Sequence, residues 1–194
     1  AGKGALAFEN YTAHNCALLE SGGMRCWGYA DWGALGYGTR SSSILNGIPS
    51  FQGDIPLFTP TELAAGEEVA QLVTNSNSSC VLTNNGNVRC WGYNENGQLG
   101  LGHTNNIGDD EPASAGGYVS ILTDAEQALG IRVQKLSGNY RMFCALLTDG
   151  GVRCWGQNIG WIMGDKRPYA DLVGNNEVPS NLPTISLGGP ATDI

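Results

Sequence analysis

Short apolar segments separated by glycine-rich turns set the hydrophobic pattern of this 194-residue chain. Segments such as "CALL" and "CVL" are continuously apolar and do not alternate with polar residues, which is typical of strands covered on both faces. Each unit begins with a short apolar strand and continues into a hairpin, so the pattern predicts three strands per unit. The expected first strands are Ala5–Phe8, Val69–Val73 and Val133–Leu136.

The unit repeats with a period of 64 residues. Cysteine occurs at positions 16, 80 and 144, and each is followed ten residues later by a second cysteine and then by Trp-Gly. Because a fixed internal period dictates the architecture of a chain, we divide this one into repeats at residues 1–64, 65–128 and 129–190. Residues 191–194 are then the opening strand of a further unit, or a strand that docks on a neighbour.

The two cysteines of each unit face each other across a predicted turn. In "CVLTNNGNVRC" the loop Asn84-Asn85-Gly86 is typical of a type I turn followed by a left-handed glycine, and counting outward pairs Cys80 with Cys90. Opposed residues of an antiparallel pair have Cβ atoms about 4.5–5.5 Å apart, which approaches disulfide geometry. We therefore expect local disulfides; the alternatives are buried free thiols and a zinc site, for which the Cys-x2-Cys spacing is absent. The expected pairs are Cys16–Cys26, Cys80–Cys90 and Cys144–Cys154.

Candidate fourth strands lie in the long polar segments between the hairpins, at residues 118–122 or 55–58, whereas "NNIGDDEPASAG" is typical of a loop. A short helix is expected at Asp124–Ala128. Units of four short antiparallel strands that repeat at such a period are typical of propeller blades. The chain is therefore predicted to be all-β, with three propeller-type blades of mostly four short antiparallel strands.

The pattern "CALL-x-x-G-x-V/M-R-C-W-G-x-x-x-x-G-x-L-G-x-G" resembles the repeat of the regulator of chromosome condensation family, whose propellers usually close with seven blades. The resemblance covers almost the whole chain, and "TNNIGDDEPASAG" is similar to a segment of cysteine-bearing bacterial members that are often predicted to be extracellular. The third repeat departs from the pattern, since Trp161 stands where Gly33 and Gly97 stand in the others. The resemblance implies fold better than function, because members include a nucleotide exchange factor for a nuclear GTPase, a secreted β-lactamase inhibitor and surface proteins.

Composition and charge narrow the range of functions that the chain can have. The chain has 29 Gly and 8 Pro, as expected of a turn-rich β protein. A net charge of −8 with ten scattered Lys and Arg argues against nucleic acid as a binding partner, because nucleic-acid binding needs clustered cations. The same charge argues against an acidic protein partner. No apolar run approaches the roughly 18 to 20 residues that cross a bilayer. Three disulfides imply an oxidising compartment, so we expect an extracellular or cell-surface protein, with sequons at Asn10 and Asn77 as candidate glycosylation sites.

Three blades form an incomplete propeller, and both ends of the array stay uncovered. Bare apolar blade faces need a partner. Either the chain is a segment of a longer multi-blade protein, or its ends dock head to tail on other copies and form a ring or a filament. The candidate self-association strand resembles the first strand of the second repeat and consists of Ala191, Thr192, Asp193 and Ile194.

Few residues are candidates for a binding site. The tryptophans at positions 27, 91 and 155 recur in register, which packing explains better than a ligand ladder. Trp32, Tyr37 and Trp161 break the repeat and are the candidate ligand contacts, with packing as the alternative. Asp109, Asp110 and Glu111 form a candidate calcium site, because calcium favours clustered carboxylates, but they lack the alternating ligands of a known calcium loop, and a solvated loop is the alternative.

Catalysis finds no support in the sequence. His14, which precedes Cys16, is expected to make a structural hydrogen bond, and His103 lies in a polar loop. No nucleophile with an orienting base and no phosphate-binding glycine motif is present, and no cofactor is expected. We therefore expect a non-catalytic extracellular scaffold that self-associates and binds copies of itself, further repeats of the same polypeptide, or other proteins. The alternatives are an inhibitor or adhesion fragment of a longer closed propeller, and a GTPase nucleotide-exchange regulator, which free thiols would favour.

Overall fold

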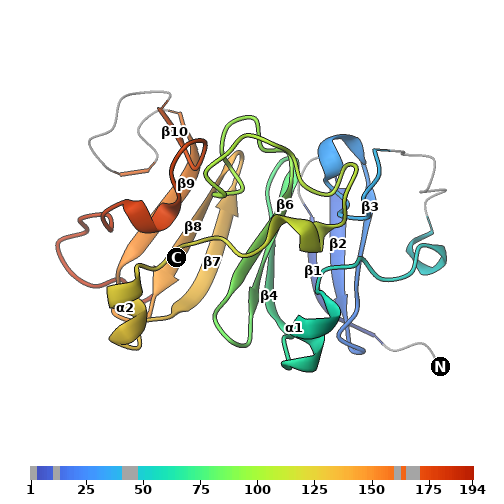
Figure 1. Cartoon of the computed structure of the whole chain (residues 1–194), viewed down its shortest axis with the longest axis horizontal. Helices are drawn as coiled ribbons and strands as arrows, with labels where there is room; N and C mark the ends of the chain where they lie inside the picture. Colours follow the sequence, from blue (N-terminus) through green and yellow to red (C-terminus); the bar gives the residue numbers. More distant parts are fainter. Residues whose placement is uncertain (1–3, 11–13, 41–47, 160–162, 165–170) are drawn as a thin grey trace.

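The computed structural model describes residues 4–10, 14–40, 48–159, 163–164 and 171–194 of the chain. In this part the strands form three antiparallel sheets that stand side by side in chain order, as predicted (Figure 1). We call the sheets blades 1, 2 and 3, and their first strands lie next to one another. The strands are β1 (Ala5–Asn10), β2 (His14–Leu19) and β3 (Met24–Gly28) in blade 1, β4 (Val69–Thr74), β5 (Ser78–Thr83) and β6 (Val88–Gly92) in blade 2, and β7 (Val133–Asn139), β8 (Met142–Leu147), β9 (Val152–Asn158) and β10 (Asp171–Val173) in blade 3.

The register within each blade follows from the hairpin turn between its second and third strands. The turn glycines Gly22, Gly86 and Gly150 all have φ near 83°, in the left-handed region that glycine adopts without steric cost. From this turn the ladder runs back to the cysteines, and Cys80 lies directly opposite Cys90. The turn and the pairing that we counted from the sequence are therefore confirmed.

Within the described residues, only blade 3 has a fourth strand. β10 pairs with the C-terminal half of β9, and the predictions of a fourth strand at residues 118–122 or 55–58 are wrong. In the second of these segments, Ile55 donates one backbone hydrogen bond to Met24 of β3 and the chain then leaves the sheet. The proline that follows Ile55 has no N–H to donate, so it weakens the segment as a strand.

Two short helices begin at matching capping boxes, α1 (Pro60–Ala64) after Thr59 and α2 (Asp124–Ala128) after Thr123. In each box the threonine hydroxyl accepts the glutamate N–H, and the glutamate carboxylate accepts the threonine N–H. The bounds of α2 are those predicted, and both helices lie along the lower edge of the molecule in Figure 1. None of the helices in the described part of the chain has the length and apolarity to span a membrane. The 3-10 helices among the described residues are η1 (Asp31–Gly33), η3 (Pro49–Phe51), η4 (Ala113–Gly116) and η5 (Pro179–Asn181).

Tryptophans of the third strands fill the seams between neighbouring blades. Trp91 and Trp155 are fully buried, and glycines of the preceding blade leave room for them. A Cβ atom at Gly36 would lie 2.9 Å from the indole nitrogen of Trp91, and one at Gly100 would lie 2.8 Å from the Trp155 ring. These two tryptophans belong to the core, as predicted, whereas Trp27 is only half-buried because no blade packs on that side of it.

Candidate interaction surfaces

All six cysteines form disulfides, and each disulfide joins opposed residues of one hairpin. The Cα atoms of the bonded residues lie 4.1, 4.1 and 4.0 Å apart in blades 1, 2 and 3. The predicted pairs are therefore confirmed, and no thiol remains to hold zinc. Because a one-residue slip would turn every side chain to the opposite face, these bonds lock the register of each blade.

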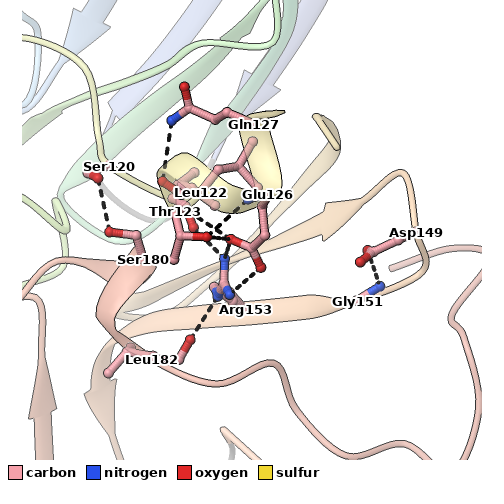
Figure 2. Close-up of polar contacts among 11 residues, drawn as sticks. Ser120, Leu122, Thr123, Glu126, Gln127, Asp149, Gly151, Arg153, Ser180 and Leu182 are labelled. Atoms are coloured by element: carbon pink, nitrogen blue, oxygen red, sulfur yellow. Dashed lines mark hydrogen bonds and ion pairs between the residues drawn. The ribbon is translucent and has the colours of Figure 1, made fainter. Parts of the chain in front are cut away.

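An arginine on the third strand of blades 2 and 3 binds the helix that precedes its blade. Arg153 donates to both carboxylate oxygens of Glu126, over 2.9 Å from Nη1 and 2.6 Å from Nη2 (Figure 2). Its guanidinium also donates to the carbonyl oxygens of Ile121 and Leu182. Arg89 makes the same kinds of contact in blade 2. We call this arrangement the arginine clamp, and it ties each blade to the segment between blades.

The clamp is almost closed to water. The side chains of Arg89 and Arg153 are 1% and 5% exposed, and those of Glu62 and Glu126 are 19% exposed. Hydrogen bonds from the arginines lower the pKa of each glutamate to about 2. Our sequence reasoning missed the clamp, although its signal was present: Arg and the Thr-x-x-Glu box both recur at the 64-residue spacing. The clamp also holds α1 against blade 2, although α1 lies within residues 1–64, the first of the predicted repeats. The boundaries of the repeats stay predictions.

The outer face of blade 1 is uncovered. Leu6 and Phe8 of β1 are 66% and 52% exposed, and the Phe8 ring packs against Trp27 with centroids 5.8 Å apart. Arg25 stands at the position of the clamp arginines but pairs with Asp54, over 2.9 Å. Blade 1 thus exposes Phe8 at the position where the other two blades bury Leu72 and Leu136, which are 3% and 1% exposed.

Within the described residues, the far side of blade 3 is uncovered at the matching positions. Gly164 corresponds to the two glycines that pack on tryptophan, but among the described residues a Cβ there would approach only the Ile185 side chain, at 3.3 Å. Ile185 donates its backbone N–H to the Val152 carbonyl as Val119 does to Val88, so Leu187, two residues further on, corresponds to Ile121. Leu187 is 56% exposed, whereas Ile121 and its counterpart Leu57 are 2% and 5% exposed. The two ends of the array therefore expose complementary halves of one seam.

The predicted self-association strand, residues 191–194, is not a strand in the structure and lies against blade 3 of its own chain. Ala191 donates a backbone hydrogen bond to Gly150 at the hairpin turn, over 2.9 Å. In blade 2 the corresponding Gly86 lies closest to Arg132 and Val133, where the chain enters blade 3. The C-terminal residues thus occupy the place where the first strand of a further blade would begin.

The two histidines do not form a catalytic set. The buried His14 has its Nε2 atom 2.8 Å from the Ser79 hydroxyl, across the seam between blades 1 and 2. Burial lowers the pKa of His14 to about 4. Nδ1 of His103 accepts the backbone N–H of Asn105 over 3.3 Å. Both contacts stabilise local structure, and the Ser79 hydroxyl is buried away from any substrate.

The acidic run at residues 109–111 brings three carboxylates together, with ligand atoms within 4.8 Å of one another. Asp109 is buried and pairs with Arg40 over 2.6 Å, and Glu111 accepts the N–H of Gly108 over 3.1 Å. Burial, followed by the hydrogen bond with Asp110, raises the pKa of Glu111. Because protein groups already engage two of the three carboxylates, we make no proposal of a calcium site, which stays a prediction.

The structure separates the three aromatic residues predicted as ligand contacts. Trp161 lies outside the described residues. Tyr37 packs on the core and donates its hydroxyl to the Gly53 carbonyl over 3.2 Å. Trp32 is half-buried and meets Tyr93 of blade 2, with ring centroids 5.2 Å apart. Of the two described residues, Trp32 is therefore the one that is partly exposed and in contact with another blade.

The two sequons differ in access. Asn10 is exposed at the end of β1, and the two residues after it lie outside the described part of the chain. Asn77 is half-buried, and Ser78 and Ser79 of the same sequon are fully buried in β5. Glycosylation stays a prediction at both positions.

Comparisons with known proteins agree with the repeat pattern. The family model described as "Regulator of chromosome condensation (RCC1) repeat" matches residues 69–98. The chain is 30% identical to the ultraviolet-B receptor UVR8 of Arabidopsis thaliana over 161 residues, which is 79% of this chain and 30% of the receptor. It is 26% identical to the human X-linked retinitis pigmentosa GTPase regulator over 181 residues, which is 93% of this chain and 15% of the regulator.

Solved structures show the same fold. The crystal structure of human WBSCR16 has a TM-score of 0.64 and 19% identity, and the match covers 98% of this chain and 42% of that one. Prp20p of Saccharomyces cerevisiae has a TM-score of 0.61 and 27% identity, and the match covers 84% of this chain and 34% of that one. The chain thus spans less than half the length of each of these proteins.

Proposed function

Because the chain belongs to the regulator of chromosome condensation repeat family, we propose that it is a non-catalytic protein-binding scaffold whose copies associate head to tail. In this proposal the open side of blade 3 receives blade 1 of the next copy. Such a heterologous contact generates a ring when its rotation closes and a filament when it does not. The three disulfides are compatible with an extracellular location, and we place the scaffold outside the cell.

The main support is that residues at the two ends correspond to residues that meet across a seam inside the chain. Inside the chain, Trp91 of blade 2 rests on Gly36 of blade 1 and donates its indole N–H to the Ala34 carbonyl over 3.2 Å. Trp27 and Gly164 are the corresponding residues at the two open ends. An incoming blade of the same repeat would make contacts at both ends that the chain already makes internally, and at the blade 3 end its first strand would displace residues 191–194.

The arginine clamp supports the same match. Arg89 donates to the Leu57 carbonyl, in the segment between blades 1 and 2, over 2.6 Å. Arg25 and Leu187 occupy the corresponding positions at the two ends, and the exposed Leu187 is apolar, as its buried counterparts are. Covering Leu187 and the apolar face of blade 1 removes apolar area from water, which favours association.

Light scattering after size-exclusion chromatography tests the proposal. We expect the native chain to show masses that are multiples of 20.4 kDa and that increase with concentration. Phe8→Asp places a charge on the blade 1 end and Leu187→Asp places one on the blade 3 end, so each variant should remain a monomer. Leu129→Asp is the matched control, because Leu129 is 80% exposed and is the C-cap of α2, in the segment between blades 2 and 3.

Mixing the two end variants distinguishes a head-to-tail contact from a symmetric one. Phe8→Asp keeps an intact blade 3 end, and Leu187→Asp keeps an intact blade 1 end, so a head-to-tail mixture should form a dimer of twice 20.4 kDa and nothing larger. A native chain that stays monomeric at every concentration would contradict self-association. A mixture of the variants that stays monomeric would contradict its head-to-tail geometry.

A second candidate is that further repeats of the same polypeptide cover both ends, in a longer propeller that serves as a protein-binding, inhibitor or adhesion domain. The observation in its favour is that the chain covers only 42% of WBSCR16 and 30% of the ultraviolet-B receptor. The intact mass of the protein from its natural source tests this candidate. A mass well above 20.4 kDa with additional repeats would favour it over self-association.

Nucleotide exchange on a small GTPase is a less favoured candidate. Its support is the similarity to Prp20p, a protein that binds Gsp1p and histones. The three disulfides of this chain disfavour the reducing compartment in which such an exchange factor works. Non-reducing mass spectrometry of the natural protein decides the point, because six free thiols would restore the exchange function as a candidate.

A further inference from the structure

A row of aromatic rings crosses all three blades. It consists of the rings of Tyr29 and Trp32 of blade 1, Tyr93 of blade 2 and Tyr140 of blade 3, together with the Arg141 guanidinium, and we call this set the aromatic row. Ring centroids of Tyr29 and Trp32 lie 5.8 Å apart, and those of Trp32 and Tyr93 lie 5.2 Å apart. The Arg141 guanidinium continues the row, at 5.9 Å from the Tyr93 ring and 5.2 Å from the Tyr140 ring.

The aromatic row lies on the edge of the molecule opposite helices α1 and α2. Its members follow β3 and β6 or stand in the turn between β7 and β8, and these segments lie at the upper edge in Figure 1. Tyr29 and Tyr140 are 45% and 47% exposed, and the other three members are half-buried. The rings thus form a continuous surface that is open to solvent.

Two members of the aromatic row hold an unfavourable backbone conformation. Trp32 has a φ of 57° and Tyr140 a φ of 38°, and they are the only non-glycine residues with positive φ in the described ranges. Bulky side chains rarely adopt this region, and such strain is concentrated at functional sites. Packing of the repeat does not require an aromatic side chain here, since Asn96 takes the place of Trp32 in blade 2.

Carboxylates line the aromatic row. The Tyr29 hydroxyl donates to Asp31, and the Tyr93 hydroxyl donates to Glu95 over 2.9 Å. Glu95 also lines an adjoining hollow of about 490 Å³, together with the acidic run at residues 109–111 and with Arg40. The surface therefore combines exposed rings with negative charge, on a chain whose net charge is −8.

We propose that the aromatic row binds an extended, arginine-bearing peptide segment of a partner protein. Arg141 already shows the contact in question, because its guanidinium lies on two rings of the row. The rings of Tyr29 and Trp32, with the carboxylates of Asp31 and Glu95 beside them, offer the same combination of cation–π contact and ion pair to an arginine of the partner. An extended segment suits a row that runs across three blades.

An acidic or neutral partner fits this surface less well. The hydroxyls of Tyr29 and Tyr93 already donate hydrogen bonds to carboxylates. Neither hydroxyl proton is therefore free to bind the hydroxyl groups of a glycan. The negative charge beside the rings attracts a cationic segment and repels an acidic one. The proposal does not depend on what covers the two ends of the array, because the row lies on neither end face.

Calorimetric titration of the full chain with a ten-residue Arg-Pro repeat peptide tests the proposal. We expect binding that weakens at least tenfold in Trp32→Ala, which removes a ring, and in Glu95→Gln, which removes a charge at an exposed position that leaves the fold intact. Phe51→Ala is the matched control, because Phe51 is an 80% exposed aromatic residue outside the row, and its affinity should stay within twofold of the native value. A Glu-Pro repeat peptide should not bind.

Three outcomes would overturn the proposal. The first is the absence of any binding of the Arg-Pro peptide. The second is native affinity in both Trp32→Ala and Glu95→Gln, because the attraction would then come from net charge alone. The third is preferential binding of a neutral oligosaccharide such as cellohexaose, which would assign the row to a glycan. Thermal unfolding of each variant confirms that it is folded before titration.

Discussion

Buried arginines carry the most demanding side-chain chemistry of this protein. Arg89 and Arg153 each lie among a helix glutamate and backbone carbonyl oxygens. Taking a guanidinium out of water is costly unless its donors find acceptors, and the clamp supplies an acceptor to each of the three guanidinium nitrogens. Arg25 holds the same position in blade 1 but has a side chain that is 27% exposed. The same residue type at the same repeat position thus occupies two environments.

The clamp predicts unequal costs of substitution at this position. Arg153→Met should lower the free energy of unfolding by about 3 kcal/mol, because it leaves Glu126 without its partner in a nearly closed site. Arg25→Met should lower it by less than about 1 kcal/mol, because exposed ion pairs contribute little. Urea denaturation of the two variants and the native chain measures both values. Equal losses in the two variants would contradict the burial argument.

At the scale of elements, local signals were sufficient for the hairpins but not for the fourth strands. The turn glycines and opposed cysteines lie within ten residues of each other, so their pairing could be counted from the sequence. Residues 55–58 and 118–122 have apolar character typical of strands, but Ile55 and Val119 each make one backbone bond to the sheet. Their apolar side chains are buried by packing between blades. A segment that is buried without pairing in a β-sheet therefore has the same apolar sequence pattern as a strand.

The hairpin disulfides should differ in their rate of reduction. The cysteines of blades 1 and 2 are fully buried, whereas Cys144 is half-buried and Cys154 is 8% exposed. Because reduction requires a thiolate to attack a sulfur atom, dithiothreitol under native conditions should open Cys144–Cys154 first. Alkylation followed by peptide mass spectrometry identifies the first pair, and in urea the three pairs should react at similar rates. Earlier opening of Cys16–Cys26 would instead indicate that blade 1 opens locally.

At the scale of the whole molecule, stability depends on seams between blades. Gln71 of β4 donates to and accepts from the backbone of Leu136 in β7, over 2.8 Å in each case, so a side chain links the first strands of blades 2 and 3. His14 and Ser79 join blades 1 and 2. These contacts connect residues 65 positions apart and make each seam a polar as well as an apolar junction.

His14, which lies in the seam between blades 1 and 2, should make the free energy of unfolding depend on pH. Its pKa falls from 6.5 to about 4 in the folded state, so the unfolded chain binds the proton more readily between these values. The contribution of neutral His14 to the free energy of unfolding is complete above pH 6.5 and is lost as the pH falls towards 4. At about pH 4.5 the loss is roughly 2 to 3 kcal/mol. Urea midpoints at about pH 7.5 and 4.5 measure this loss. His14→Gln should lose less stability over the same range, and an unchanged pH dependence in this variant would contradict the assignment.

The sequence alone determined the repeat, its hairpin turns and its three disulfides, because each depends on residues that are neighbours along the chain or in one ladder. Only the tertiary structure decided which repeat positions are buried. Arg153 meets Glu126 at a separation of 27 residues, and Trp32 of blade 1 meets Tyr93 of blade 2. Trp27 and Trp91 share one place in the repeat, yet they differ in burial because a preceding blade covers only the second. Contacts between blades depend on how sheets stack in space, and a local pattern carries no record of that stacking.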